Sequence, residues 1–167
     1  MAAEVVYAEE RFRAVAPTDR DRFERMLARH HRRLRRAVAG ILADRDGVDD
    51  VLQDAYIKAY VKLPRRFANE AHEAAWLSRV VTRCALDEMR RRARRREERH
   101  ELELVQDDAH VALELEDAFR NLDARDRAIL MLVGVLELDQ AAAARILRMP
   151  RGTLAWRLHE ARARLRP

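Results

Sequence analysis

The chain is 167 residues long and 49% hydrophobic, so it can build packed cores for one ordinary domain or two small ones. With 4 Gly and 4 Pro, and with Ala, Leu, Arg and Glu abundant, nearly every segment favours helix, which predicts an all-α fold and excludes one built on strands. The formal charge is +5 and the basic residues are almost all arginine, which favours a nucleic-acid partner, although a GC-rich genome also enriches arginine.

The first predicted helix runs from a cap at Thr18 or Asp19 to about Ala43. Its hydrophobic residues recur at helical spacing and predict a buried stripe, while its other face is mostly arginine. The stripe consists of Phe23, Leu27, Leu34, Val38 and Ile41.

A turn at "DRDGVDD" precedes a second helix, predicted over about 47–63 with Pro64 after its end. The face opposite its buried side mixes carboxylates and aliphatics, namely Asp50, Asp54, Ile57 and Val61. Such a mixture is unusual for a solvated surface, so we consider a protein-binding face beside the alternative of a slightly apolar solvent face. The buried stripe is predicted to contain Val48, Val51, Leu52, Ala55, Ala59 and Leu63.

A polar loop, "PRRFANEAHEAAW", is predicted between Pro64 and a third helix that starts near His72. The third helix ends in the block "RRRARRREER", residues 90–99. Seven arginines against two glutamates in these ten residues focus a positive potential, which favours nucleic acid over a plain solvated helix end. The residues that this helix is expected to turn inward are Leu77, Val80, Val81, Cys84, Ala85 and Met89.

The charge then reverses in an acidic segment whose hydrophobic spacing is irregular and which separates two periodic regions. We interpret residues 100–110 as a linker between domains at 18–99 and 111–167. In the second domain a helix continues to about Leu122, Asp123 caps "ARDRAILMLVGVL" and Asp139 caps "QAAAARILR". The predicted fold is therefore two small helical domains joined by an acidic linker.

The last two helices predict a helix-turn-helix, with the turn at Met149 and Pro150 and the final helix over 151–166. Many such turns place Gly at a positive φ, but here the position holds Arg148, which leaves the turn geometry open. Any antiparallel helix pair with a basic edge gives a similar pattern. The inner stripe, Leu154, Leu158, Ala161 and Leu165, is expected to pack on Ala143, Ala144 and Leu147.

The outer face of the final helix carries the residue types that read a major groove. Arginine bridges the O6 and N7 atoms of guanine, and threonine contacts the methyl group of thymine. The residues on this face are Arg151, Thr153, Trp156, Arg157 and Arg164.

No enzyme site, metal site or cofactor site is predicted. Cys84 stands alone in an apolar helical pattern, which is typical of a packed thiol. The six histidines have no cysteine partner or recurring ligand spacing, and four glycines cannot build the usual phosphate-binding loops. No stretch has the length of a signal peptide core or a membrane span, so we expect a cytoplasmic protein without membrane insertion.

Three segments in order resemble the extracytoplasmic-function sigma factors, group IV of the bacterial sigma factor family. They are "DGVDDVLQDAYIKAYVKLPRRF", "AWLSRVVTRCALDEMRRRARR" and "LDARDRAILMLVGVLELDQAAAARILRMPRGTLAWRLHEARARLR". The resemblance extends over about residues 23–166. It implies a sigma region 2-like domain, a sigma region 4-like helix-turn-helix domain, and an alternative sigma factor that directs promoter recognition, DNA melting and transcription initiation.

The resemblance also implies partners and contact residues. The segment "DDVLQDAYIKAY" matches the family helix that docks on core RNA polymerase, and the loop after it matches the one that captures a flipped base of the minus-ten strand. The implied polymerase contacts are Asp50, Gln53, Asp54, Ile57 and Val61. The implied minus-ten contacts are Phe67, Asn69, Glu70, His72 and Trp76, then Arg79 and Arg83, then Arg90, Arg91, Arg92, Arg94 and Arg95, although Trp76 at helical spacing also fits a core position.

By the same resemblance the final helix reads the minus-thirty-five element of promoter DNA, through Arg151, Gly152, Thr153, Trp156, Arg157, His159 and Arg164. The chain departs from the family at "AAAA" (141–144), at Arg148 and at Trp156. Two alternatives remain: a stand-alone helix-turn-helix regulator, and a sigma-like module diverted to an anti-sigma partner. Trp156, which lies opposite the inner stripe, is expected to contact DNA, the other domain in a closed state, or an anti-sigma factor.

Overall fold

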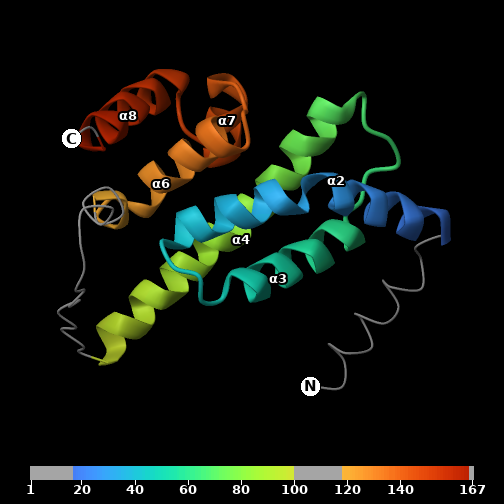
Figure 1. Cartoon of the computed structure of the whole chain (residues 1–167), viewed down its shortest axis with the longest axis horizontal. Helices are drawn as coiled ribbons and strands as arrows, with labels where there is room; N and C mark the ends of the chain where they lie inside the picture. The colour runs from blue at the N-terminus through green and yellow to red at the C-terminus, as the bar shows by residue number, and fades with distance from the viewer. Residues whose placement is uncertain (1–16, 100–117, 166–167) are drawn as a thin grey trace.

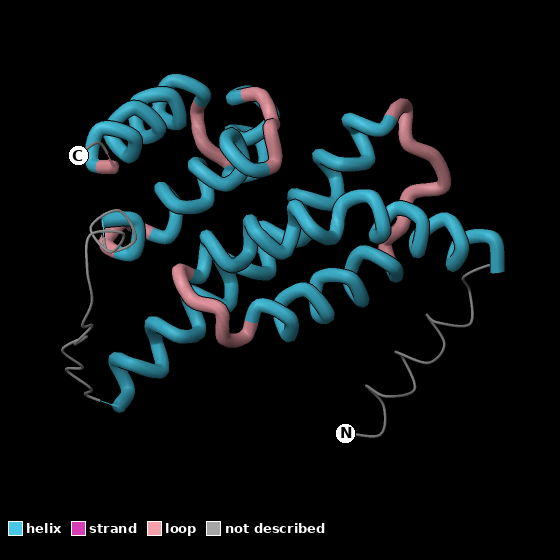
Figure 2. Tube along the Cα trace, in the orientation of Figure 1, coloured by secondary structure: helices cyan, strands magenta, loops and turns pink. Residues whose placement is uncertain are grey.

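The computed structural model describes residues 17–99 and 118–165, so the predicted linker at 100–110 lies outside the described residues (Figure 1). Within the described ranges every regular element is a helix, which confirms the all-α prediction, and the loops inside each range are short (Figure 2). The elements are α2 (Pro17–Leu42), α3 (Val48–Val61), α4 (Glu70–Arg99), α6 (Ala124–Leu130), the π-helical η1 (Met131–Val135), α7 (Gln140–Leu147) and α8 (Arg151–Arg164).

Helices α2, α3 and α4 pack around one hydrophobic core, and α4 runs behind the other two in Figure 1. The predicted stripes of α2 and α3 face this core, although Leu27 and Leu63 are only half-buried. In the first half of α2 the fully covered residue is Met26 rather than Leu27. Helical spacing places both close to the stripe, and nothing in the sequence indicates which of them a neighbouring helix covers.

Helix α4 begins two residues before the predicted start at His72. Asn69 provides the reason, because its side-chain Oδ1 accepts a hydrogen bond from the backbone N–H of His72 at 2.9 Å and so caps the helix. The first turn also holds Glu70 and Glu73, which suit the positive end of the helix dipole. The polar loop is therefore shorter than expected, and Glu70, His72 and Trp76 lie on the helix.

The second helical group contains α6, η1, α7 and α8 around a smaller core. Asp123 and Asp139 cap α6 and α7 as predicted, with their side chains accepting bonds from the N–H groups of Arg125 and Ala142. The segment predicted as one helix after Asp123 is α-helical only to Leu130, and then widens into the π-helix η1. The inner core residues are Ile129, Leu132, Ala143, Ala144, Ile146, Leu154 and Leu158.

The two helical groups pack against each other. Helix α6 lies beside α2 in Figure 1, and α2 also contacts η1. Ala128 of α6 is part of the first core, and Met131, Leu136 and Leu147 pack on that core from outside. Within the described residues, none of the helices is long and apolar enough to cross a lipid bilayer. The domain boundaries at 18–99 and 111–167 stay predictions.

Candidate protein and nucleic-acid interfaces

The outward face of α3 is a mixed polar and apolar surface. Asp50 and Gln53 are exposed, and Ile57 exposes 46% of its surface although it is a large aliphatic residue. Asp54 is half-buried and forms an ion pair with Lys58 at 2.6 Å, and Val61 is also half-buried. Four of the five predicted contact residues therefore lie on one accessible face, and Val61 lies near its end.

A groove between α2 and α3 adjoins this face, which the sequence pattern did not predict. It has a volume of about 450 Å³ and is lined by aromatic and aliphatic side chains together with Asp49 and Gln53. At its edge the Tyr56 hydroxyl lies 3.0 Å from Nδ1 of His31, and burial raises the pKa of Tyr56 to about 12. The tyrosine therefore stays neutral and gives the groove an uncharged wall. Its other lining residues are Phe23, Leu52, Ile57 and Tyr60.

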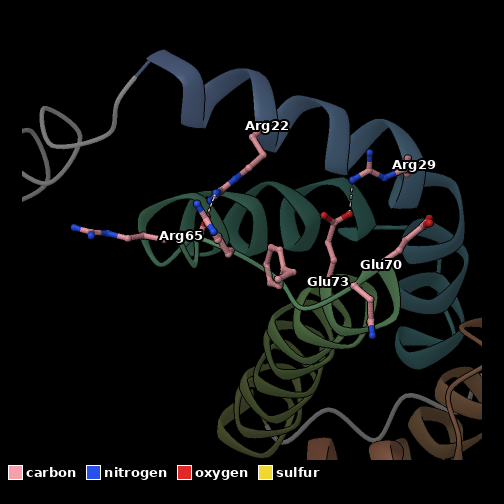
Figure 3. Close-up of a pocket in the computed structure, with 8 residues that line it drawn as sticks. Arg22, Arg29, Arg65, Glu70 and Glu73 are labelled. Carbon is pink, nitrogen blue, oxygen red and sulfur yellow. Dashed lines mark hydrogen bonds and ion pairs between the residues drawn. The ribbon is translucent and has the colours of Figure 1, made fainter.

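A pocket of about 470 Å³ lies where the α3–α4 loop meets α2 and the start of α4 (Figure 3). Arg22 donates hydrogen bonds to the backbone carbonyls of Pro64 and Arg65, which tie the loop to α2. Arg29 binds the buried Glu73 carboxylate at 2.5 Å, and Nε2 of His30 lies 3.1 Å from the same oxygen. These contacts hold the walls of the pocket in place.

The pocket has an excess of positive charge. Its lining includes four arginines, Arg22, Arg29, Arg65 and Arg66, against the two carboxylates Glu70 and Glu73, together with Phe67 and Asn69. Arginines at a concave surface attract phosphate oxygens, and an aromatic ring offers a stacking surface for a base. The pocket therefore has the chemistry of a site for single-stranded nucleic acid.

The turn between α7 and α8 keeps a helix-turn-helix geometry without glycine. Arg148 ends α7 in the left-handed region, at φ 54° and ψ 49°, and the N–H of Met149 donates to the carbonyl of Ala144 at 3.1 Å. The conformation is the one that Gly usually supplies after a helix, and here a non-glycine residue adopts it. Pro150 is the N-cap of α8, which begins at Arg151. The turn geometry, which the sequence left open, is therefore regular, although Arg148 adopts a conformation that is strained for a residue other than glycine.

The accessible face of α8 is broad and basic. Arg151, Gly152, Thr153, His159 and Arg164 are all exposed, and Trp156 exposes 65% of its surface. Leu154, Leu158 and Ala161 of the predicted inner stripe are buried against α6 and α7, whereas Leu165 is only partly buried. A helix fixed on one side and open on the other can enter a DNA groove.

Comparisons with known proteins address the same regions. The family models of sigma-70 region 2 and sigma-70 region 4 match residues 26–95 and 112–165. The extracytoplasmic-function RNA polymerase sigma factor SigM of Mycobacterium tuberculosis is 31% identical over 151 residues, covering 88% of this chain and 76% of SigM. The chain belongs to the extracytoplasmic-function sigma factors. It is therefore an alternative sigma factor that directs transcription initiation.

Further comparisons agree with this family. The sigma factor SigW of Bacillus subtilis is 25% identical over an alignment that covers 95% of this chain and 94% of SigW. The sigma factor RpoE of Bartonella quintana, solved in complex with the anti-sigma factor NepR, shares the fold at a TM-score of 0.68, with 23% identity, covering 86% of this chain and 93% of that one. CnrH, solved with the cytosolic domain of CnrY, has a TM-score of 0.57 and 25% identity, covering 96% of this chain and 92% of that one.

In this sigma factor, the side chain of Arg92, which was predicted to contact minus-ten DNA, is held by other residues of the protein. It turns back along α4 and donates to Asp44 at 3.1 Å, to Glu88 at 3.1 Å and to the backbone carbonyl of Asp46 at 2.8 Å. The guanidinium therefore binds the α2–α3 loop, and it is directed away from the solvent that a phosphate would occupy. The sequence could not indicate this, because Asp44 and Asp46 lie far from Arg92 along the chain.

The other arginines of the block remain at the surface. Arg90 pairs with Asp87, and Arg91 and Arg95 pair with Glu88, while each of the three stays exposed. Burial pushes the pKa of Glu88 upward, but the hydrogen bond from Arg92 and the charges of Arg91 and Arg95 outweigh it and lower the pKa. Arg83 and Arg94 are exposed as well, and Arg79 is half-buried.

Arg157 is also withdrawn from the surface to which it was assigned. Its Nε donates to Asp126 at 2.6 Å and its Nη2 donates to Asp123 at 2.7 Å, so that only 24% of the side chain is exposed. The hydrogen bond to Asp126 is the main reason that the pKa of Arg157 is raised. The residue connects α8 to the start of α6, and its guanidinium is held by these two carboxylates.

The predicted minus-ten residues divide into two sets. Phe67, Asn69 and Glu70 line the pocket of Figure 3, and His72 is exposed beside it. Trp76 is half-buried, and its ring packs on that of Phe67 with centroids 5.4 Å apart, so the core alternative describes it better. Five lining residues were not predicted from the sequence, although arginine recurs at 22 and 29 on the first helix and was an available signal. They are Arg22, Arg29, Arg65, Arg66 and Glu73.

Proposed function

We propose that this sigma factor binds core RNA polymerase through the outer face of α3 and holds the unpaired minus-ten strand at the pocket of Figure 3. The exposed face of α8 reads the minus-thirty-five element. The observation that supports the proposal best is the pocket itself, which combines four arginines with Phe67 in about 470 Å³. That volume falls in the range of about 300–1,000 Å³ that is typical of ligand sites.

The proposed mechanism uses binding energy and no covalent step. Extruding a base from a duplex costs a few kcal/mol, which stacking and polar contacts to the flipped base offset. Phe67 offers an aromatic surface, and the arginines at 65 and 66 neutralise the adjacent phosphates. Strand opening then follows from preferential binding of the single strand over the duplex.

Two further proposals follow from the family. The outer face of α3, with Asp50, Gln53, Asp54 and Ile57, is the polymerase contact, because an exposed aliphatic among carboxylates supports a protein partner. The exposed Arg90, Arg91, Arg94 and Arg95 hold phosphates near the melted region. A cytoplasmic location follows from both partners.

An anti-sigma partner is proposed as well. RpoE of Bartonella quintana was solved with the anti-sigma factor NepR, and CnrH with the cytosolic domain of CnrY. The apolar groove between α2 and α3, about 450 Å³ in volume, adjoins the proposed polymerase face. A protein that covers this groove would compete with polymerase for the same surface.

The pocket is tested with holoenzyme reconstituted from this protein and core polymerase. Binding of a fluorescent single-stranded minus-ten oligonucleotide is compared between the wild type and a protein with Arg66→Ala and Phe67→Ala. We expect the double variant to lose about 10-fold or more, since stacking alone contributes about 1–3 kcal/mol per base. Arg36→Ala, an exposed arginine of α2 outside the pocket, is the matched control. Equal binding by all three proteins would remove the pocket from the proposal.

A further inference from the structure

The arginines that line the pocket of Figure 3 are of two kinds. Arg65 and Arg66 belong to the α3–α4 loop and are exposed to solvent. Arg22 and Arg29 come from α2, and each is bound to another part of the protein. Arg29, for example, donates to the buried carboxylate of Glu73 at 2.5 Å. The two kinds therefore differ in what they can offer to a DNA strand.

The guanidinium of Arg22 is bound to the backbone of the loop. Its Nη1 donates to the carbonyl of Arg65 and its Nη2 donates to the carbonyl of Pro64, so one planar group holds two successive carbonyls. Figure 3 shows the side chain reaching from α2 to the loop. Its Nη2 also lies 3.6 Å from the carboxylate of Asp19, and only 30% of the side chain is exposed. Both terminal nitrogens therefore already have partners in the protein.

The loop that Arg22 holds is the one that carries Phe67. One end of this loop follows the last turn of α3, and the other end is fixed where Asn69 caps α4. Between the two ends, the carbonyls at 64 and 65 accept hydrogen bonds from Arg22. The direction of a carbonyl sets the orientation of its peptide plane, and hence the direction in which the following side chains leave the backbone. Arg22 thus orients the segment that presents Arg66 and Phe67 to the pocket.

This arrangement has a cost. The Nε atom of Arg22 is buried, and within the described part of the chain it has no hydrogen-bond partner. A buried donor without an acceptor raises the free energy of the folded state, which offsets part of what the two carbonyl bonds contribute. The main effect of Arg22 is therefore on the placement of the loop. A binding loop that is held in its bound conformation loses less entropy when the ligand arrives.

We propose that Arg22 is a positioning residue for base capture, which acts through the loop backbone and makes no contact with DNA. Phe67 then stacks on the flipped base, and the loop arginines neutralise the adjacent phosphates. The proposal rests on the proposed function, because the pocket must be the place where the base is held. It follows that Arg22 controls how the base is held and leaves the number of neutralised phosphates unchanged.

A fluorescent base provides the first test. Holoenzyme is mixed with single-stranded minus-ten oligonucleotides in which 2-aminopurine replaces each base in turn, and the captured position is the one whose fluorescence changes most with the wild type. Stacking on an aromatic ring changes this fluorescence. At saturating protein, Arg22→Ala is expected to lose at least about half of the change, because the ring of Phe67 is no longer held against the base. Measurement at saturation separates base capture from affinity.

The salt dependence of binding provides the second test. Arg22→Ala is expected to weaken binding of the unlabelled oligonucleotide by about 3- to 10-fold, the cost of ordering the loop when the strand binds. The logarithmic slope against salt is expected to stay unchanged, because Arg22 neutralises no phosphate. Arg66→Ala is expected to reduce that slope by about 0.7, the value for one phosphate of a single strand.

Two further variants serve as comparisons. Arg22→Lys keeps the charge and the aliphatic stem but lacks the planar pair of donors, so its fluorescence is expected to match that of Arg22→Ala. Arg20→Ala removes an exposed arginine of the same helix, which pairs with Glu24 outside the pocket, and is expected to match the wild type. Thermal unfolding of each variant identifies any loss of the fold, and Arg22→Lys, the smaller change, then carries the test.

The outcomes separate the role of Arg22 from the proposed function. A full fluorescence change in Arg22→Ala would overturn the positioning role. A reduced salt slope in Arg22→Ala, with wild-type behaviour in Arg22→Lys, would also overturn it and make Arg22 a phosphate contact. If the double variant Arg66→Ala and Phe67→Ala keeps the wild-type signal as well, the pocket is not the site of the base and the proposed function falls.

Discussion

At the scale of single residues, three non-glycine positions in the described part of the chain adopt a positive φ: Ala43 at 52°, Glu137 at 55° and Arg148 at 54°. Each follows a helix or the π-helical turn, where glycine has no steric penalty. These helix ends were hard to predict from the sequence, because none of them has the glycine that usually follows a helix. At position 148 the chain has arginine where many helix-turn-helix proteins have glycine, but the turn adopts the usual left-handed conformation.

Arg148→Gly is expected to stabilise the folded protein by about 0.5–1 kcal/mol, because the left-handed conformation carries no Cβ penalty in glycine. Chemical denaturation followed by circular dichroism measures the change. Arg145→Gly, inside α7, is the matched control and is expected to destabilise by about 1 kcal/mol. A loss of stability in Arg148→Gly would show that the Arg148 side chain contributes more than the strain costs.

Trp156 and Arg157 are neighbours on α8 with different roles. Trp156→Ala is expected to weaken minus-thirty-five duplex binding by about 1–3 kcal/mol, the range of a good base contact, with no loss of stability. Arg157→Ala is expected to lower the stability of the α6–α8 group by about 1–3 kcal/mol, since it removes charged hydrogen bonds to Asp123 and Asp126. Duplex titration and thermal unfolding separate the two effects.

One alternative for Trp156 was a contact with the other domain in a closed state, and the structure does not show that contact. The side chain is 65% exposed although the two helical groups are packed together, so the other group does not cover it in this structure. The proposed partners of Trp156 are therefore DNA and an anti-sigma factor. Unchanged duplex affinity in Trp156→Ala would assign the residue to the protein partner.

At the scale of elements, the sequence predicted α2, α3, α4, α7 and α8 and most of the residues that they bury, but it predicted α6 and η1 as one helix. Periodicity and caps are local signals, and Asp123, Asp139 and the stripes of α3 and α8 follow them. Long-range pairing has no local signal. The sequence therefore indicated a uniform arginine surface at the end of α4, whereas the fold assigns Arg92 to the loop before α3.

The exposed arginines of the 90–99 block and the intramolecularly bound Arg92 are expected to contribute differently to the salt dependence of promoter binding. Replacing Arg90, Arg91, Arg94 and Arg95 with Ala is expected to flatten the dependence of promoter binding on salt, by about 0.7–0.9 in the logarithmic slope for each phosphate that is no longer neutralised. Arg92→Ala is expected to leave the slope unchanged and to lower stability. Holoenzyme titrations at several salt concentrations measure the slope, and an unchanged slope in the fourfold variant would assign these side chains to solvent.

At the scale of the whole molecule, α3 and α8 occupy separate positions on one packed body (Figure 1), and the pocket is lined by residues of α2, the α3–α4 loop and the start of α4. The pocket could be predicted only in part. Its loop residues, Phe67 and Asn69, lie within a recognisable segment, but the wall formed by Arg22 and Arg29 comes from α2, a different part of the chain. Where the two helical groups pack together, Met131 of η1 approaches α2 so closely at Gly40 that a Cβ built there would lie 2.3 Å from its Sδ, and these two residues are far apart in the sequence.

Asp54→Arg tests the polymerase face. The substitution reverses a charge beside Lys58 and is expected to change stability by no more than about 0.5–1 kcal/mol, because the pair is largely solvated. Retention on immobilised core polymerase is expected to fall. Glu24→Arg, a reversal on the exposed side of α2, is expected to be retained like the wild type. Equal retention of both variants would remove the proposed docking face.

Run-off transcription with core polymerase tests the central claim most directly. The wild-type protein is expected to direct a transcript of defined length from a template that carries a minus-ten and a minus-thirty-five element, and none from a template without them. Core polymerase alone is the control. The absence of any promoter-dependent transcript, together with clean duplex binding by the protein alone, would contradict the account and leave a stand-alone helix-turn-helix regulator.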